Sequence, residues 1–351
     1  MKVPRYRMPA LSLDSHFLKN AIESKQLARG ESYERFRKII ADKLGFKSSV
    51  LCSNGFSAIQ LAIETLGIKK SKIVVPAAST CMAIVNAVRA SGNVPIYCDL
   101  ELETASLDSK KLHDLILTEN PALAISPAHF GLVKEYDQEI YQVIKILEDN
   151  AQAFLSDITY PVRRDSYARI YSFYPTKGLN AIDGGAFVSH EEYEMNKCSN
   201  ISNYDAIRND DGVIRHNFRM NNVNCAVGLD SIDGLTVSIN RRNEIKSVYS
   251  KVLENFDNVT FIDGPKTILQ KFVLRFADEK SRNMFRVKMI NHGIGASNEL
   301  NYLPPKKRLV LDGARELSKT TCSIPFYETL SDQELDYVTD KLNKVLKAIS
   351  D

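Results

Sequence analysis

The chain has 351 residues, a length that suggests about two domains and allows a large buried core. Apolar residues make up 44% and charged residues 25%, as in ordinary soluble globular proteins. The net charge of +3 is too small to indicate nucleic acid or an anionic membrane as a partner. No run approaches the ~20 apolar residues of a membrane span, and the N-terminus lacks a signal-peptide core, so we expect a cytoplasmic protein.

The six cysteines are scattered, with no CxxC pair and no histidine at ligand spacing, and the six histidines are equally dispersed. Reduced thiols and the absence of a metal site are therefore expected. Catalysis by a bound metal has no support in this sequence.

Short apolar runs alternate with helical patterns from residue 49 to residue 189. The strand-like runs lie at 50–53, 72–77, 94–99, 123–128, 145–149, 169–174 and 185–189. The segment 57–67 is typical of the helices between them. This alternation predicts an α/β fold with a mainly parallel sheet covered by helices on both faces. Only a turn joins the last two runs, so an antiparallel strand is expected there.

The pattern changes after about residue 235. Long amphipathic helices are predicted at 239–256 and 332–349, with strand-like segments at 258–263 and 270–277 between them. We therefore predict a larger domain, residues 1–235, followed by a smaller α+β domain, residues 236–351.

Ligands of open parallel sheets bind at the carboxyl ends of the strands, so the residues found there are informative. The first strand is followed by "SNGFSA", where Gly55 gives a tight turn and Ser57 stands at the expected helix N-cap. Backbone N–H groups in such a turn can hold a phosphate, although an ordinary strand-to-helix turn explains the motif as well. The fifth strand ends in "LEDNAQA", with Asp149 at its tip and Gln152 close behind. Taken alone, Asp149 is better explained as a helix cap.

The sixth strand brings Ser172 to the same edge, and the turn after it brings Lys177. A single lysine in a turn is usually a solvated side chain. The combination of a phosphate turn, a carboxylate, an amide and a lysine, however, fits pyridoxal phosphate (PLP). The PLP aldehyde needs a lysine amine for a Schiff base, its pyridine nitrogen needs a carboxylate, and its phosphate needs N–H donors.

With these motifs, the sequence resembles the PLP-dependent sugar-nucleotide aminotransferases (DegT-type) of the aspartate aminotransferase fold. The matching segments run from about residue 50 to the C-terminus and include "SNGFSAIQLAIETLGI", "ILEDNAQAF", "YSFYPTKGLNAIDGGAFVS" and "HNFRMNNVNCAVGLDSID". The pair "EDNAQA" and "SFYPTK" is the specific part, whereas the glycine turn is not. The resemblance implies PLP fold type I, a mainly parallel mixed sheet sandwiched by helices with a smaller α+β C-terminal domain.

The resemblance implies a role for each residue that faces the reacting end of the cofactor. Lys177 matches the Schiff-base lysine, which also moves the proton between substrate carbon and cofactor. Asp149 matches the partner of the pyridine nitrogen, and Gln152 the residue that faces the phenolic oxygen of the ring. A desolvated lysine beside a cationic imine has a depressed pKa, so it can act as a base near neutral pH.

The phosphate end is implied in the same way. Gly55, Phe56 and Ser57 match the phosphate turn, and Ser172 adds a hydroxyl to the same phosphate. Asn217 in "HNFRM" matches an asparagine that reaches the phosphate of the neighbouring subunit. The resemblance therefore implies a homodimer with shared active sites.

Some positions depart from the family pattern. Phe56 stands where a threonine is usual, and Cys81 stands where an aromatic side chain is stacked on the ring. The stretch "IDGG" replaces the usual "GDGG". These departures bear on cofactor affinity and on the identity of the substrate more than on the reaction type.

The activity that the resemblance implies is transfer of an amino group, from L-glutamate, onto a nucleotide-linked keto sugar for amino-sugar and cell-surface polysaccharide biosynthesis. A PLP-dependent sugar dehydratase is disfavoured, because that branch has histidine at the position of Lys177. Two alternatives stay open: an aminotransferase for a cyclitol or free ketose, and a catalytically silent regulatory homologue. Intact Lys177, Asp149 and Gln152 argue against the silent homologue.

Two further features are interpreted structurally. His129 in "SPAHFG" lies at a strand end, but a structural role is favoured because no nearby residue gives it a partner. The run "LPPKKR" (303–308) lies in the region of the family's substrate loop, and a solvated basic run is the preferred interpretation.

Overall fold

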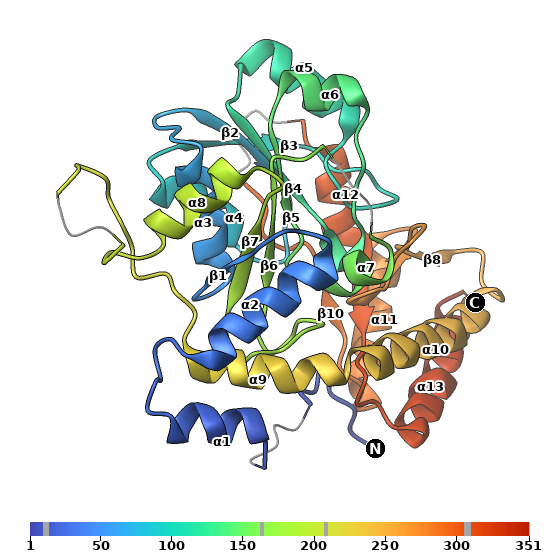
Figure 1. Ribbon diagram of the computed structural model, residues 1–351. Helices are drawn as coiled ribbons and strands as arrows, with labels where there is room; N and C mark the ends of the chain where they lie inside the picture. Colours follow the sequence, from blue (N-terminus) through green and yellow to red (C-terminus); the bar gives the residue numbers. More distant parts are fainter. Residues whose placement is uncertain (10–13, 162–164, 207–209, 305–309, 351) are drawn as a thin grey trace.

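The computed structural model describes residues 1–9, 14–161, 165–206, 210–304 and 310–350. Among these residues, seven strands form the main sheet in the order β1-β7-β6-β5-β4-β2-β3 (Figure 1). The strands are β1 (Val50–Cys52), β2 (Lys72–Pro76), β3 (Val94–Cys98), β4 (Leu123–Pro127), β5 (Ile146–Asp149), β6 (Ala168–Ser172) and β7 (Gly185–Val188). All seven predicted strands are confirmed to within two residues at each end.

The main sheet is parallel except at one edge. Strand β7 pairs antiparallel with both β1 and β6, while β2 to β6 pair in parallel. The antiparallel strand expected after the lysine turn is therefore β7. It places Gly185 opposite both Cys52 and Ser172, which brings the ends of β1 and β6 together.

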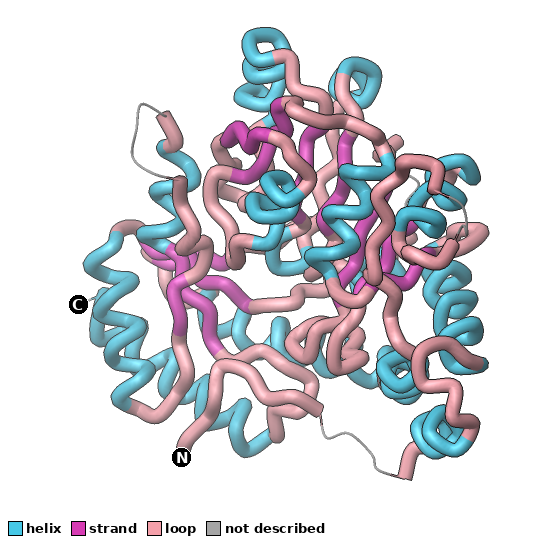
Figure 2. Tube along the Cα trace, turned by 90° about the vertical axis from the view of Figure 1, so that its left-hand side faces the viewer, coloured by secondary structure: helices cyan, strands magenta, loops and turns pink. Residues whose placement is uncertain are grey.

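Helices cover both faces of this sheet, as Figure 2 shows from the side. They are α1 (His16–Glu23), α2 (Glu31–Leu44), α3 (Gly55–Thr65), α4 (Ala83–Ala90), α5 (Ser109–Glu119), α6 (Gln138–Val143), α7 (Phe154–Thr159), α8 (Glu192–Ile201) and α9 (Asn222–Asp233), with a 3-10 turn η1 at His129–Gly131. Alternation along the strands assigns the faces: Val50 and Cys52 pack with α3, α4 and α8, whereas Leu51 packs with α2, α7 and α9. Burial on both faces explains the near-continuous apolar strands.

A second sheet lies in the C-terminal part, in the order β10-β11-β9-β8. Its strands are β8 (Val259–Phe261), β9 (Phe272–Phe276), β10 (Ser297–Asn298) and β11 (Thr321–Ile324), and its helices are α10 (Leu235–Leu253), α11 (Glu279–Asn291), α12 (Asp312–Thr320) and α13 (Asp332–Ser350). The strands predicted at 258–263 and 270–277 are confirmed as β8 and β9, and the helix predicted at 332–349 is confirmed as α13. Helix α10 starts four residues before the predicted position 239, and β10 and β11 were not predicted.

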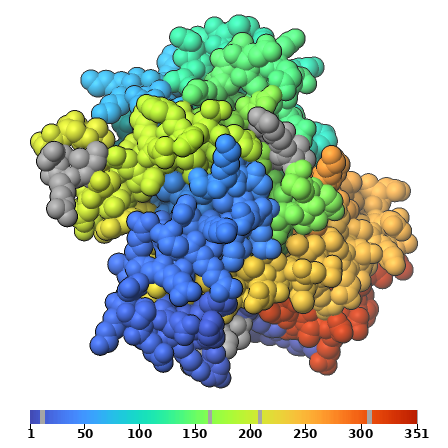
Figure 3. Space-filling model, in the orientation of Figure 1, coloured from blue at the N-terminus to red at the C-terminus, as the bar shows by residue number. Residues whose placement is uncertain are grey.

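The first residues of the chain lie beside this C-terminal part (Figures 1 and 3). Val3 pairs in parallel with Ile294, through hydrogen bonds of 2.9 and 2.8 Å with Gly293 and Gly295. The domain boundary at residue 235 stays a prediction. The start of the chain, assigned by that prediction to the larger domain, pairs with the smaller one.

None of the helices in the described part of the chain is long and apolar enough to cross a membrane. The longest of these helices carry charged residues along their length, as "DQELDYVTDKLNKVLKAIS" in α13 illustrates. Their apolar positions instead face the core, where Leu335, Val338 and Leu342 are buried.

Candidate active site

A cavity of about 440 Å³ lies where β1, β2, β5 and β6 end and α3 begins. Every predicted site residue lines it except Ser57 and Asn217. The lining residues are Asn54, Gly55, Phe56, Ile59, Thr80, Cys81, Ala83, Asp149, Ala151, Gln152, Ile170, Ser172, Tyr174, Thr176, Lys177, Asp183, Gln270 and Lys271. The strand ends therefore converge on one cavity, as the parallel topology predicts.

The start of α3 forms one wall of the cavity, and here the predicted cap is wrong. Asn54, not Ser57, is the N-cap: its Oδ1 accepts the Ser57 N–H at 2.8 Å. The Ser57 hydroxyl in turn accepts the Asn54 N–H at 3.1 Å, which completes a capping box. The helix starts two residues earlier than predicted because Asn54 is extended and its short side chain reaches back to this N–H.

The capping box leaves the first amides of α3 for a ligand. The Ser57 and Ala58 N–H groups are bonded to Asn54, so the Gly55 and Phe56 N–H groups stand at the positive end of the helix. Gly55 also packs against Ser172, since a Cβ at position 55 would lie 2.9 Å from the Ser172 Cβ. A larger residue would push the start of the helix away from β6.

The turn that carries Lys177 is fixed at several points. The Lys177 N–H donates to the Tyr174 carbonyl at 2.8 Å, and the Gln270 side chain donates to the Thr176 carbonyl at 2.7 Å. The Tyr6 hydroxyl donates to the Pro175 carbonyl. The main chain of this turn is therefore held by a bond within the turn, by Gln270 from the segment before β9 and by Tyr6 from the N-terminal segment.

Lys177 and Asp149 line the same cavity, and the charge of each affects the pKa of the other. Burial lowers the pKa of Lys177, an effect that Asp149 partly offsets. Burial likewise raises the pKa of Asp149, and the Ala151 N–H and Lys177 oppose that rise. Asp149 Oδ1 accepts the Ala151 N–H at 3.1 Å, and no other described residue is bonded to this carboxylate. An amine and a carboxylate are thus both held in the cavity without a direct bond between them.

Gln152 and Cys81 line the same cavity from the segments that follow β5 and β2. The Gln152 amide donates to Thr80 Oγ1 at 3.0 Å, and its oxygen accepts the Phe130 N–H at 3.2 Å. Cys81 follows Thr80 directly and is an exposed free thiol. The structure therefore brings Cys81 to the cavity wall.

His129 is a buried structural residue, as favoured from the sequence. The expectation that it has no nearby partner is wrong, because its Nδ1 lies 2.8 Å from the Ala105 carbonyl. Burial lowers the pKa of His129 to about 4, so the ring is neutral at pH 7 and donates this hydrogen bond. The run "LPPKKR" lies largely outside the described residues, which stop at 304 and resume at 310.

Asn217 lies away from the cavity of its own chain. Its side chain is exposed, and its oxygen accepts two hydrogen bonds from Arg219, at 3.1 and 3.3 Å.

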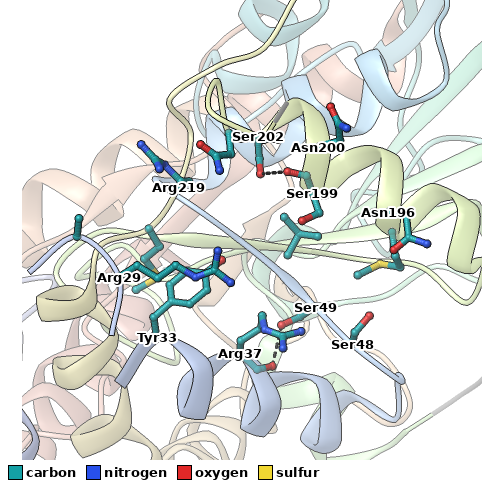
Figure 4. Close-up of a pocket in the computed structure, with 16 residues that line it drawn as sticks. Arg29, Tyr33, Arg37, Ser48, Ser49, Asn196, Ser199, Asn200, Ser202 and Arg219 are labelled. Carbon is teal, nitrogen blue, oxygen red and sulfur yellow. Dashed lines mark hydrogen bonds between the residues drawn. The ribbon is translucent and has the colours of Figure 1, made fainter. Parts of the chain in front are cut away.

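Arg219 lines a second cavity, of about 520 Å³, between α2 and α8 (Figure 4). Arg29, Arg37 and several serine and asparagine side chains surround this second cavity, and its described lining includes no lysine or carboxylate. It is larger than the first cavity but lacks the groups for amine chemistry.

Sequence reasoning missed several lining residues. Thr80 directly precedes Cys81, and Asp183 lies in the turn between Lys177 and β7; neither was predicted as a site residue. Gln270 and Lys271 come from the segment before β9, which the sequence indicates only as a strand. No local signal identifies these two, because they reach the cavity only when the second sheet packs on the first.

The residues present fit PLP. Two N–H groups at the start of α3 suit a phosphate, and Lys177 supplies an amine whose pKa is lowered. The Asp149 oxygen that has no donor among the described residues is available to a protonated ring nitrogen. Fold and site together define a PLP-dependent aminotransferase of fold type I.

Comparison with known proteins gives the family. Residues 13–343 match the DegT/DnrJ/EryC1/StrS aminotransferase family, and the chain belongs to it. The predicted resemblance, the enzyme class and the cofactor are thereby confirmed.

Individual relatives are distant but cover most of the chain. The UDP-4-amino-4,6-dideoxy-N-acetyl-beta-L-altrosamine transaminase of Campylobacter jejuni (strain 81-176) is 25% identical, over 96% of this chain and 95% of that protein. The 3-oxo-glucose-6-phosphate:glutamate aminotransferase of Bacillus subtilis is also 25% identical, over 94% of this chain and 79% of that protein. The solved structure of the putative sugar aminotransferase Spr1654 from Streptococcus pneumoniae, in its PMP form, has a TM-score of 0.87 at 17% identity, covering 100% of this chain and 99% of that chain. It confirms the fold.

Proposed function

We propose that this aminotransferase moves an amino group from L-glutamate onto a keto sugar linked to a nucleotide. The observation that carries the proposal is the meeting of Lys177, Asp149 and the first amides of α3 in one cavity. The reaction balances as L-glutamate plus keto sugar giving 2-oxoglutarate plus amino sugar. Such products serve amino-sugar and polysaccharide biosynthesis, with the enzyme in the cytoplasm.

Each residue has a proposed task. When bound, PLP supplies a carbonyl carbon that takes up the amino group and a ring that withdraws electrons from the reacting carbon. Lys177 Nζ would move the proton from the reacting carbon of the donor to the bound cofactor in the first half-reaction, and from the cofactor to the reacting carbon of the acceptor in the second. Its lowered pKa leaves more of the amine neutral at a given pH, which suits a base. Asp149 holds the positive charge on the ring nitrogen.

The other cavity residues hold the cofactor in place. The Gly55 and Phe56 N–H groups and the Ser172 hydroxyl bind the phosphate, while Gln152 faces the phenolic oxygen and Cys81 lies on the ring face. The Ser57 hydroxyl is engaged in the capping box, so its proposed contribution is to position these amides.

The nature of the two substrates is supported by the names of relatives. The Campylobacter relative is named for a UDP-linked amino sugar, which supports a nucleotide-linked acceptor. The Bacillus relative is named for glutamate, which supports this donor. The same name specifies a sugar phosphate without a nucleotide, so a sugar phosphate is the second candidate acceptor.

We also propose a homodimer with shared active sites. The exposed side chain of Asn217 does not line the cavity of its own chain, and although its oxygen accepts from Arg219, its amide N–H groups are available to another chain. In this arrangement Asn217 binds the phosphate in the site of the partner subunit.

The test is turnover with a panel of acceptors. Purified protein with PLP and L-glutamate is incubated with nucleotide-linked keto sugars, with a keto sugar phosphate and with a keto cyclitol, while 2-oxoglutarate is measured. We expect turnover with a nucleotide-linked sugar and none with Lys177→Ala. Turnover confined to the sugar phosphate or the cyclitol would reject the proposed acceptor class. No turnover with any acceptor would favour the silent homologue.

A further inference from the structure

A small side cavity of about 100 Å³ adjoins the active-site cavity, and we call it the annex. Thr176, Gln270 and Lys271 line both cavities, so the annex begins directly beside the turn that carries Lys177. Its other walls come from the N-terminal segment and from the end of the second sheet. They are formed by Arg5, Tyr6, Ser323, Ile324 and Phe326.

The annex carries an excess of positive charge. Lys271 Nζ lies 2.7 Å from Glu299 Oε2, and Arg5 Nη1 lies 3.0 Å from Glu299 Oε1. Two cations thus share one carboxylate, and the net charge of these three side chains is +1. Glu299 is only 3% exposed, and it also accepts a hydrogen bond from the Ser323 hydroxyl at 2.6 Å. Its carboxylate is therefore fixed in place and stays there when a ligand binds.

Hydrogen-bond donors are left on both cations. An ammonium group has three N–H donors and a guanidinium group has five, whereas the described contacts use only part of them. The side chains of Lys271 and Arg5 are 28% and 43% exposed, so both can be reached from the cavities. A second carboxylate can therefore bind between them with charge-assisted hydrogen bonds.

The annex also has an apolar side. Ile324 and Phe326 form part of its wall, and both are buried. A short methylene chain that ends in a carboxylate matches this combination of apolar wall and cationic end. Its position next to Lys177 matches a group attached to the donor carbon, and the positive charge of Lys271 contributes to the lowered pKa of Lys177, as expected for near neighbours.

We propose that the annex binds the side-chain carboxylate of a dicarboxylic amino donor through Lys271 and Arg5. Glu299 is a positioning residue that holds both cations at the annex wall. The inference rests on the proposed function and adds to it the part of the site that selects L-glutamate over uncharged amino acids.

The first test measures binding without turnover. Calorimetry follows glutarate, a dicarboxylate with no amino group, binding to the PLP-loaded protein. Lys271→Met keeps the length of the side chain but removes its charge, and we expect it to weaken glutarate binding by on the order of tenfold or more. Lys271→Arg keeps the charge and should restore most of the affinity.

A matched control is available in the same part of the chain. Lys246 pairs with Asp263 at 2.6 Å and is 25% exposed, much like Lys271, but lines neither cavity. Lys246→Met should leave glutarate binding unchanged. Because Glu299 is buried, thermal unfolding of Lys271→Met is compared with that of Lys246→Met, and Arg5→Gln provides a second variant whose side chain is more exposed.

The second test compares two donors of the same shape. L-Glutamine differs from L-glutamate by a neutral amide in place of the side-chain carboxylate. We expect Lys271→Met to lower kcat/KM for L-glutamate by about tenfold or more, mainly through KM, while kcat/KM for L-glutamine changes less than about threefold.

The outcomes separate the inference from the function on which it rests. Equal losses for both donors, or no loss for either, would overturn the annex as the donor subsite while leaving the aminotransferase in place. Glucose 6-phosphate is titrated in the same way as a probe for an acceptor phosphate. If Lys271→Met weakens its binding and leaves glutarate binding unchanged, the annex binds a phosphate and the inference is overturned. A wild-type protein that uses no amino acid donor at all would instead reject the proposed function.

Discussion

At the scale of single residues, the environment of Lys177 accounts for its chemistry. A lysine in water is an ammonium ion at neutral pH, whereas burial of Lys177 in the cavity favours its neutral form. Asp149 opposes this effect, so the two side chains set the protonation state of the amine between them. The balance is open to direct measurement.

The protein without cofactor should show this balance as a pH profile. Only the neutral amine reacts with trinitrobenzenesulfonate, so labelling of Lys177 should rise with pH and reach half its maximum below the midpoint of free Nα-acetyl-lysine. In Asp149→Asn the carboxylate that stabilises the ammonium form is gone, so the midpoint should move to still lower pH. Peptide mass spectrometry measures the labelling at Lys177. A midpoint at or above that of Nα-acetyl-lysine contradicts a lowered pKa.

Cys81 permits a second test at this scale. If Cys81 lies on the ring face, Cys81→Phe should tighten PLP binding by about 0.5–1.5 kcal/mol through stacking, which is roughly two- to tenfold. Cys81→Leu adds apolar volume without a ring and is the matched control. Equilibrium dialysis of PLP with each variant measures the effect. Equal affinities for the phenylalanine and leucine variants would speak against stacking at this position.

At the scale of elements, the start of α3 joins local stability to ligand binding. Asn54 closes the capping box, and the amides that the box leaves unbonded are those at the cavity wall. The same side chain should therefore affect the stability of the helix and the affinity for phosphate.

Asn54→Ala should lower the free energy of unfolding by about 1 kcal/mol and also weaken PLP binding. Asp278 caps α11 in the same way, through the Ser281 N–H and hydroxyl at 2.8 and 2.9 Å, but lies outside the cavity. Asp278→Ala should lose a similar amount of stability with no change in PLP affinity. Urea unfolding and PLP titration measure the two quantities. If both variants lose PLP affinity alike, the cap of α3 has no special part in binding.

The sequence predicted the elements of the main sheet well because each strand is a short apolar run bounded by turn residues, as at 72–77 and 185–189. It predicted the cavity because parallel strand ends must converge, which brought Asp149 and Lys177 together. The cap at Asn54 was missed because Ser57 is an equally good capping residue by type. Lys271 was missed because its approach to the cavity depends on packing between two sheets, which no local pattern records.

At the scale of the whole molecule, the proposed sharing of sites makes activity a property of two chains. Asn217 lies outside the cavity of its own chain, and Lys177 lies inside. If each site combines Lys177 of one chain with Asn217 of the other, two variants that are each inactive can form one intact site in a mixed dimer.

Mixing Lys177→Ala chains with Asn217→Ala chains, each inactive or badly impaired alone, should restore activity. In a mixed dimer one site has both changes and the other has none, so random exchange should recover roughly a quarter of the wild-type activity. Subunit exchange is verified by native mass spectrometry, and 2-oxoglutarate release gives the activity. No recovery despite exchange would mean that Asn217 serves its own chain.

The pairing of Val3 with Ile294 also constrains how the protein is made. A ribosome adds about 5–20 residues per second, so the start of the chain emerges on the order of half a minute before its partner segment exists. During that time Arg5 lacks Glu299 and Tyr6 lacks Tyr327, and the lysine turn lacks its hydrogen bond from Gln270. The nascent main sheet can therefore fold first, but the finished catalytic pocket forms only near the end of translation.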